Sequence, residues 1–400
     1  MEKTTTAFIC LLFFSISSFS KNKEADKLAA LSDSSLTKQT VSNQSQGGSS
    51  WKEFFKITSE KDLASKPKLG GFFIGDYSYY SNGEKDATAG FSIRCARLYL
   101  DGTLLKDFIY RVQMEVAGAP GVDKGPRLLD AYLEWAKHPY FKIKIGQYKR
   151  PFTFENPLSL WTVGYGAYSQ ATIKLSGMSD RVGEHSSSGR DAGLQFQGDL
   201  FPVGRDGHRF FHYQIGVFNG QGLNHNDVNR NKDLIGGIWI APLKDLRIGT
   251  FGWTGRYGAT LANLGKQKVN RNRLSVGVDY ESDWVFRSEY ITSEGGKISD
   301  DITYKYAANK ADAWYAMIGV PATSKLKIYG KWDVYRDEKT DDTKSSVYAV
   351  AFNYKLMKDL MFQLTYAFNQ ARSAKYTSTG ARSVSESNYN QITLQTYIRF

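Results

Sequence analysis

The stretch FKIKIGQYKRPFTFENPLSL, residues 141–160, is the part of the sequence that decides its fold. It opens as a strand, because apolar Phe141, Ile143 and Ile145 alternate with polar or small residues. No run of comparable alternation follows for about forty residues. A loop of that length inside a compact chain is usually functional rather than a spacer. We therefore expect this segment, which ends near Arg190, to fold into the lumen of a transmembrane β-barrel and to form its constriction.

Alternating runs occur on both sides of this stretch, from Gly70 to the end of the sequence. They are roughly ten residues long, the length that a tilted membrane strand needs, and each sets an apolar face against a polar one. The clearest are FIYRVQMEVA (108–117), LQFQGDL (194–200), RLSVGVDY (273–280), LKIYGKWDVY (326–335), FQLTYAFN (362–369) and ITLQTYIRF (392–400). Alternation alone also suits a half-buried soluble sheet, so further features must decide.

Three features favour a membrane barrel. Charged residues such as Arg111 and Lys331 recur on one face only, as a watery lumen opposite lipid requires. Short turns alternate with longer loops, and the strands between them number about sixteen, an even number. The last run ends on the aromatic Phe400, which resembles the C-terminal signal recognised by the barrel-assembly machinery. The longer loops are expected near residues 81–88, 118–125, 149–190, 219–233, 258–271, 293–311, 337–344 and 371–386.

The N-terminal region differs in composition from the rest. Residues 1–20 carry Lys3, an apolar core and small residues, which predicts a signal peptide. Residues 21–69 form a polar, flexible periplasmic lead with a possible short helix, and residues 70–400 form the barrel domain. Outside the N-terminus no stretch of 18 or more apolar residues occurs, so membrane-spanning helices are not expected.

Charge and cysteine content limit the possible functions. The formal net charge of +12 is compatible with nucleic acid, an acidic membrane surface, an anion pathway or simply a solvated basic surface. In a barrel we favour the anion pathway and expect no nucleic-acid partner. Cleavage of the signal would leave only Cys95, so no disulfide framework is possible within the chain.

The chain resembles the phosphate-selective porin O and P family of Gram-negative outer membranes. The resemblance rests on FSIRCARLYLDGTL (91–104), RLLDAYLEW (127–135) and IGQYKRPFTFEN (145–156), with weaker echoes in GVFNGQGLN and the terminal run. It implies a sixteen-stranded porin, a homotrimer, a third external loop folded inward, and a pore that favours small anions such as phosphate. The lysine and the serine pair of phosphate-specific members are replaced here by Asn156 and Ser159-Leu160, which puts strict phosphate selectivity in doubt.

Positive charge on lumen-facing positions is what an anion pathway needs. The candidate residues of this pathway are Arg94, Arg97, Lys142, Lys144, Lys149 and Arg150. The expected constriction residues are Tyr148, Pro151, Phe152, Glu155 and Trp161, and the expected polar lumen residues are Arg111, Asp130 and Lys331. Neutralising pairs are expected along strands, namely Arg111 with Glu115, Arg287 with Glu289 and Lys331 with Asp333. Lys149 and Arg150 have no acid within four residues and are the preferred functional residues.

We do not expect an enzyme, a metal or a cofactor. The five histidines show no metal-ligand spacing, and neither a nucleophile elbow nor a phosphate-cradling glycine loop occurs. The sequence predicts an outer-membrane porin for passive diffusion of small anionic solutes, integral in the lipid of a Gram-negative outer membrane. The alternatives are a non-specific porin and a barrel that serves as an adhesin or scaffold.

Overall fold

The computed structural model describes residues 64–82, 85–117, 125–228, 230–299 and 308–400. The chain divides into two compact units, Met1–Phe54 and Phe55–Phe400, and the described residues belong to the second. The expected signal peptide and almost all of the expected periplasmic lead lie outside the described residues. Within those residues, no helix is both long and apolar enough to cross a membrane.

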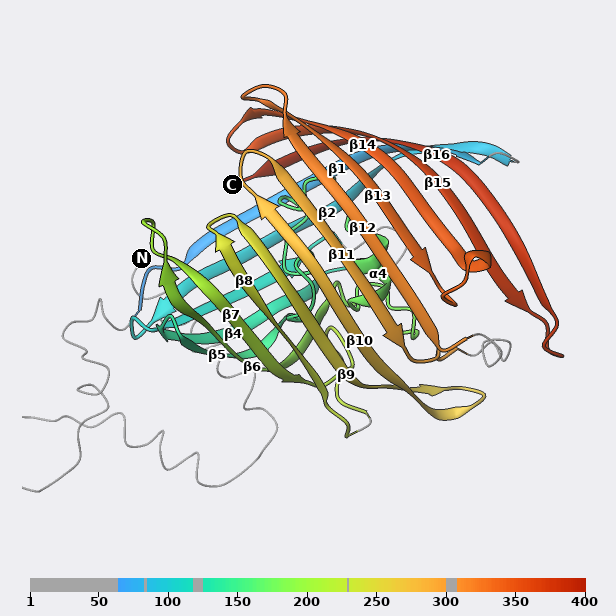
Figure 1. The fold of residues 1–400 in the computed structure, drawn as a ribbon, viewed down its shortest axis with the longest axis horizontal. Helices are drawn as coiled ribbons and strands as arrows, with labels where there is room; N and C mark the ends of the chain where they lie inside the picture. The colour runs from blue at the N-terminus through green and yellow to red at the C-terminus, as the bar shows by residue number, and fades with distance from the viewer. Residues whose placement is uncertain (1–63, 83–84, 118–124, 229, 300–307) are drawn as a thin grey trace, which may run out of the picture. The chain divides into compact units, whose positions relative to one another are not determined.

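Sixteen antiparallel strands form a closed barrel, in which each strand pairs with its neighbours in sequence and β1 pairs with β16 (Figure 1). This confirms the expected fold class and strand number. The elements are β1 (Lys68–Asn82), β2 (Lys85–Leu104), β3 (Phe108–Glu115), β4 (Arg127–His138), β5 (Phe141–Lys149), α4 (Gln170–Leu175), β6 (Arg190–Val203), β7 (His208–Phe218), β8 (Asp233–Leu243), β9 (Leu246–Leu261), β10 (Gly265–Glu281), β11 (Val285–Glu294), β12 (Lys310–Pro321), β13 (Leu326–Arg336), η3 (Asp341–Thr343), β14 (Lys344–Met357), β15 (Leu360–Tyr376) and β16 (Arg382–Arg399).

Apolar residues face outward from this barrel and polar residues face inward. On β10, Leu274 and Val276 are 51% and 47% exposed, whereas Ser275 between them is fully buried. On β16, Leu394 is 49% exposed and Gln395 is 2% exposed. The period-two pattern of the sequence therefore places apolar side chains on the outside and polar side chains on the inside, the opposite of a soluble protein. This is the arrangement of a barrel surrounded by lipid.

Several connections are shorter than the sequence predicted. The regions expected as loops at residues 81–88, 258–271 and 371–386 are mostly strand, since β2, β10 and β15 run into them. The strand β2 has 20 residues, about twice the length that spanning a membrane requires. The ends of these strands extend beyond the membrane-spanning length. Apolar and polar residues do not alternate there, because neither face of the strand needs to be apolar. The connection from β5 to β6 has the predicted bounds.

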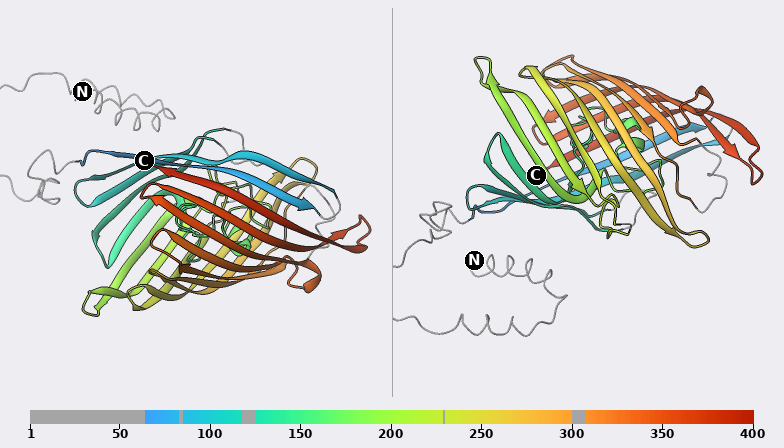
Figure 2. Two further views of the ribbon diagram at one scale, coloured as in Figure 1. Left: turned by 90° about the horizontal axis from the view of Figure 1, so that it is seen from above. Right: turned by 60° about the horizontal axis from the view of Figure 1, so that its bottom comes forward.

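The segment 150–189 between β5 and β6, hereafter the inner loop, lies inside the ring (Figures 1 and 2). Its residues contact strands far around the barrel. The Phe154 ring packs against aromatic rings of β8 and β9, and the Trp161 ring packs against Tyr397 of β16. The carbonyl of Gly164 accepts hydrogen bonds from side chains of β14 and β15. Helix α4 begins after Ser169, whose hydroxyl accepts from the Thr172 amide as an N-cap. The inner loop therefore crosses the interior and ends beside β6.

Candidate functional site: the inner loop and the cavities beside it

The inner loop is held first by aromatic packing. Phe152 is fully buried, with its ring centroid 5.5 Å from that of Trp253, and the Phe154 ring lies 5.0 Å from that of Phe251 in an edge-to-face arrangement. Such geometry is favoured by the quadrupoles of the rings. These contacts fix the start of the inner loop on β8 and β9, immediately after it leaves β5.

Backbone amides of the inner loop are then satisfied by carboxylates of the barrel wall. Glu289 on β11 accepts hydrogen bonds from the amides of Phe154 and Glu155, at 2.7 and 3.1 Å, and from the hydroxyl of Tyr315. Further along, the amide of Gln170 donates to Asp333 on β13 at 2.8 Å. A buried amide without a partner costs free energy, so these carboxylates hold the inner loop in one position.

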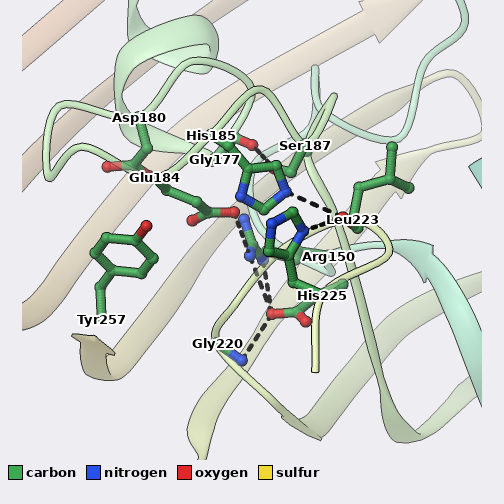
Figure 3. A network of polar contacts seen from close by, with 12 residues as sticks. Arg150, Gly177, Asp180, Glu184, His185, Ser187, Gly220, Leu223, His225 and Tyr257 are labelled. Atoms are coloured by element: carbon green, nitrogen blue, oxygen red, sulfur yellow. Dashed lines mark hydrogen bonds and ion pairs between the residues drawn. The ribbon is translucent and has the colours of Figure 1, made fainter. Parts of the chain in front are cut away.

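A buried network of charges joins the two ends of the inner loop (Figure 3). Arg150 is fully buried and contacts Glu184 at 2.8 Å and Asp191 at 3.0 Å. Glu184 also pairs with Arg271 of β10, which in turn contacts Asp233 at 2.5 Å. Breaking such a buried pair leaves a charge without compensation, which is strongly destabilising. Arg150 therefore ties the start of the inner loop to its end.

Asp180 forms a second charged anchor. Its carboxylate receives two hydrogen bonds of 2.6 Å from Arg273 of β10. Burial by itself would raise the pKa of Asp180, but the Arg273 guanidinium more than compensates and lowers the pKa to about 2. Asp180 thus stays ionised at neutral pH, and this side of the inner loop remains fixed to the wall.

Apart from Asp191 on β6, the wall residues of these anchors lie on β8 to β13. Open space remains on the other side, along β1 to β7. One cavity, of about 410 Å³, includes Lys144, Lys149 and Pro157 among its lining residues. A second, of about 580 Å³, includes Arg94, Arg127 and Tyr168. Arg97 and Arg190 line both cavities. These two arginines therefore stand where the cavities approach each other beside the inner loop.

The lining is strongly cationic. Eight lining residues are Lys or Arg and three are acidic. The basic ones are Arg94, Arg97, Arg111, Arg127, Lys144, Lys149, Arg190 and Arg399, and the acidic ones are Asp76, Glu115 and Asp130. Several of the basic groups have acidic partners that do not line the cavities, such as Asp101 for Arg111 and Glu134 for Lys144. The lining residues therefore carry more positive than negative groups.

Most of the sequence-predicted site residues border these cavities. The cavity of about 410 Å³, which we call the lower cavity, is lined by Arg97, Arg111, Asp130, Lys144, Tyr148, Lys149, Pro151 and Trp161 of that set. The cavity of about 580 Å³, the upper cavity, adds Arg94. Arg94 has no ion pair within the residues that the structure describes, and its buried Nε lacks a hydrogen-bond partner there.

Five predicted residues line neither cavity. Arg150, Phe152 and Glu155 are at most 1% exposed and belong to the anchors of the inner loop. Lys142 pairs with Asp199 at 2.9 Å, and Lys331 with Asp333 at 3.4 Å while its ammonium lies 4.1 Å from the centroid of the Tyr165 ring. Arg150 was a preferred candidate because no acid lies near it in sequence. Its partners come instead from 34 and 41 residues further along the chain.

Two of the expected along-strand ion pairs are wrong. Arg111 contacts Asp101 at 2.7 Å rather than Glu115, and Arg287 contacts Asp279 at 2.7 Å rather than Glu289. Each partner is the residue directly opposite on the neighbouring strand. Directly opposite side chains lie closer together than residues two or four apart on one strand. The pair of Lys331 with Asp333 is confirmed.

Sequence reasoning missed Arg127, Arg190 and Arg399 as lining residues. Arg190 is the first residue of β6 and donates to both carboxylate oxygens of Asp130, at 2.8 and 2.9 Å. Aligning the registers of β4, β5 and β6 would have revealed it. Among the described residues, no group of three or more His, Cys, Asp or Glu is arranged to hold a metal ion.

A closed sixteen-strand barrel, apolar outside and polar inside, with an inward connection beside open cavities, is the fold of outer-membrane porins. Residues 68–242 match the model of the phosphate-selective porin O and P family. The chain has no match among the curated proteins compared with it.

Solved structures share the fold at low identity. An anion-selective porin from Comamonas acidovorans aligns at a TM-score of 0.60 and 12% identity, over 84% of this chain and 100% of that one. The outer membrane channel DcaP of Acinetobacter baumannii gives 0.55 and 16%, over 86% and 99%. The trimer form of OmpT, an outer membrane protein of Vibrio cholerae, gives 0.52 and 15%, over 84% and 99%.

Proposed function

We propose that this porin is a passive diffusion channel that favours small anions, and that solutes pass between the inner loop and the wall formed by β1 to β7. The observation that carries the proposal is that Arg97 and Arg190 line both cavities. A solute that moves from one cavity to the other passes these two guanidiniums. Cationic groups on low-dielectric walls concentrate anions locally and repel cations.

The spacing of the charges suits conduction rather than tight binding. The basic groups are distributed over both cavities, and conduction requires several weak sites that a solute can leave. Arginine forks bind phosphate or carboxylate with two parallel hydrogen bonds, whereas lysine acts as a point charge. Phosphate is therefore one solute of the class that we propose, together with other small anions.

The remaining features of the proposal follow from the family and the fold. We propose a homotrimer in the lipid of a Gram-negative outer membrane, with the signal peptide at residues 1–20 cleaved and the longer loops external. The last strand, which reaches Arg399 and is followed by Phe400, would be the element recognised by the barrel-assembly machinery. The trimer form of OmpT supports the oligomer by its fold alone.

Planar-bilayer recording of the purified protein tests the proposal. We expect stepwise conductance and, in a KCl gradient, a reversal potential on the anion-selective side. The double variant Arg97→Gln/Arg190→Gln should move that potential toward zero. The matched control is Arg372→Gln, because Arg372 is an exposed arginine on β15 that lines neither cavity. Absence of steps would favour an adhesin or scaffold, and equal shifts in both variants would remove the two arginines from the mechanism.

A further inference from the structure

Aromatic rings are concentrated in the lower cavity, and they are paired with its cations. Five rings line this cavity. They belong to Phe72, Tyr99, Tyr132, Tyr148 and Trp161. A simple inorganic anion gains no binding energy from such rings, because burial of aromatic surface is favourable only against an apolar partner. Their presence beside the cationic groups therefore calls for a ligand with both properties.

Every one of these rings has a cationic group of the same cavity over its face. The Arg111 guanidinium lies 5.1 Å from the Tyr99 centroid, and the Lys144 ammonium lies 4.7 Å from that of Tyr132 and 5.3 Å from that of Tyr148. The remaining two pairs are Arg97 over Phe72, at 5.5 Å, and Arg399 over Trp161, at 4.9 Å. We call this set of paired groups the cation–ring belt.

The belt presents charge and flat apolar surface side by side. A cation over a ring is attracted by the ring quadrupole, and this attraction holds both side chains in place. A carboxylate bound by such a cation has any attached ring or hydrocarbon directed along the neighbouring aromatic surface. Four glutamine side chains, from Gln113, Gln195, Gln197 and Gln214, complete the lining with amide groups suited to polar substituents.

The upper cavity lacks this arrangement. Its lining rings belong to Tyr80, Phe91 and Tyr168, and the cation over the Tyr168 ring is Lys149, which does not line that cavity. Cationic groups and aromatic rings are therefore combined in the lower cavity. A solute that comes from the upper cavity reaches them after it passes Arg97 and Arg190. A volume of about 410 Å³ lies within the range of pockets that hold small organic molecules.

We propose that the lower cavity binds organic carboxylates with a flat aromatic body in preference to inorganic phosphate or short aliphatic acids. This inference rests on the proposed anion channel and assigns its preferred solute class. The carboxylate contacts the guanidinium or ammonium groups of the belt, and the ring of the solute packs on the aromatic surface between them. Binding stays weak enough for release, because the cavity is open to water and its sites are multiple.

Block of the chloride current separates these ligands. Benzoate, acetate and inorganic phosphate are added singly, at matched pH and ionic strength, to the reconstituted full-length protein. We expect benzoate to reach half-block at a concentration about tenfold lower than acetate, as expected for one added ring contact. Phosphate should act like acetate. If benzoate and acetate reach half-block at the same concentration while the channel still prefers anions, the aromatic preference is refuted and the anion channel stands. If the channel shows no preference for anions, the channel proposal itself is refuted.

Variants of the rings locate the effect. Tyr99→Leu/Tyr132→Leu should raise the benzoate concentration at half-block about tenfold, because the flat surface for the solute ring is lost. Tyr99→Phe/Tyr132→Phe keeps both rings and should behave like the natural protein, which guards against misfolding as the cause. Tyr348→Leu, on the outward face of β14, is the matched control. An unchanged benzoate block in the leucine variant would overturn the assignment to this belt.

Discussion

Arg190 donates hydrogen bonds to both carboxylate oxygens of Asp130, at 2.8 and 2.9 Å, and it does so at a position that lines both cavities. Both side chains are nearly buried, at 3% and 7% exposure. A bidentate pair of this kind fixes the plane of the guanidinium. The arginine is thereby held in one orientation beside the path of the solute instead of moving freely in it.

Asp130→Asn should increase the anion preference of the channel. The change removes one of the three acidic groups of the lining and leaves the arginine in place. The permeability ratio of chloride over potassium, taken from the reversal potential, should rise, and Arg190→Gln should lower it. The two effects have opposite signs, so a shift in the same direction for both would contradict an electrostatic role.

Asp180→Asn should loosen the inner loop. The substitution leaves the buried Arg273 guanidinium without its carboxylate, and loss of one partner of a buried pair costs on the order of 3–5 kcal/mol. We expect greater noise in the open-channel current and faster cleavage of the inner loop by added protease. The barrel itself should remain, as judged by its resistance to unfolding in detergent. Asp341→Asn, in the short helix η3, serves as the control.

Arg150→Gln and Lys149→Gln should differ in effect. Arg150 is buried between Glu184 and Asp191, so its loss should lower the temperature of thermal unfolding. Lys149 lines the lower cavity, and its ammonium donates to the carbonyls of Asn156 and Leu158. Its replacement should reduce the anion preference. Thermal melts and reversal potentials on both variants would show whether adjacent basic residues have these separate roles.

The contact between His185 of the inner loop and His225 should weaken in acid. Their rings stack with centroids 3.6 Å apart, and both lie within hydrogen-bond distance of the Leu223 carbonyl (Figure 3). Burial lowers the pKa of His185 below 6.5, and His225 and Arg150 act in the same direction, while the Leu223 carbonyl and Glu184 oppose them. His185 is therefore protonated more easily when its ring leaves this contact than when it is stacked on His225. The stacked contact is stable above about pH 6.5 and loses stability as pH falls.

Bilayer recording across pH 7.5 to 5, a range chosen to bracket the ordinary histidine pKa of about 6.5, measures this effect. We expect current fluctuations to increase toward acid in the natural protein. His185→Gln keeps a donor for the Leu223 carbonyl and should remove most of the pH dependence. His138→Gln, at the opposite end of strand β4 from the upper cavity, should leave it intact. Fluctuations that persist unchanged in the His185 variant would assign them to other groups.

The strands could be predicted from sequence because their pattern is local. Each run such as FQLTYAFN carries its own alternation, and a slip of one residue would turn Gln363 and Thr365 toward lipid. The ends of β2, β10 and β15 were not predicted, since past the membrane no face has to be apolar. The bounds of the inner loop were predicted because Ile145 and Leu194 lie in strong alternating strands on either side of it.

The candidate site was predicted less completely, because it depends on strand register and on distant partners. Arg94, Arg97 and Lys144 were found from charge and from the family resemblance. The burial of Arg150 by Glu184 and Asp191 depends on a chain reversal inside the barrel that no local pattern reveals. The pairing of Arg111 with Asp101 required the β2–β3 register, which alternation alone does not specify.

The attachment of the inner loop to β8 to β16 divides the barrel into two halves with separate tasks. Apart from Arg399, every residue that lines the two cavities lies between Gly71 and Gln214. Most of the wall partners that hold the inner loop come later in the sequence. Solute preference therefore depends mostly on one contiguous portion of the chain, which could be exchanged between homologues as a block. The portion that supports the inner loop can then evolve independently of solute preference.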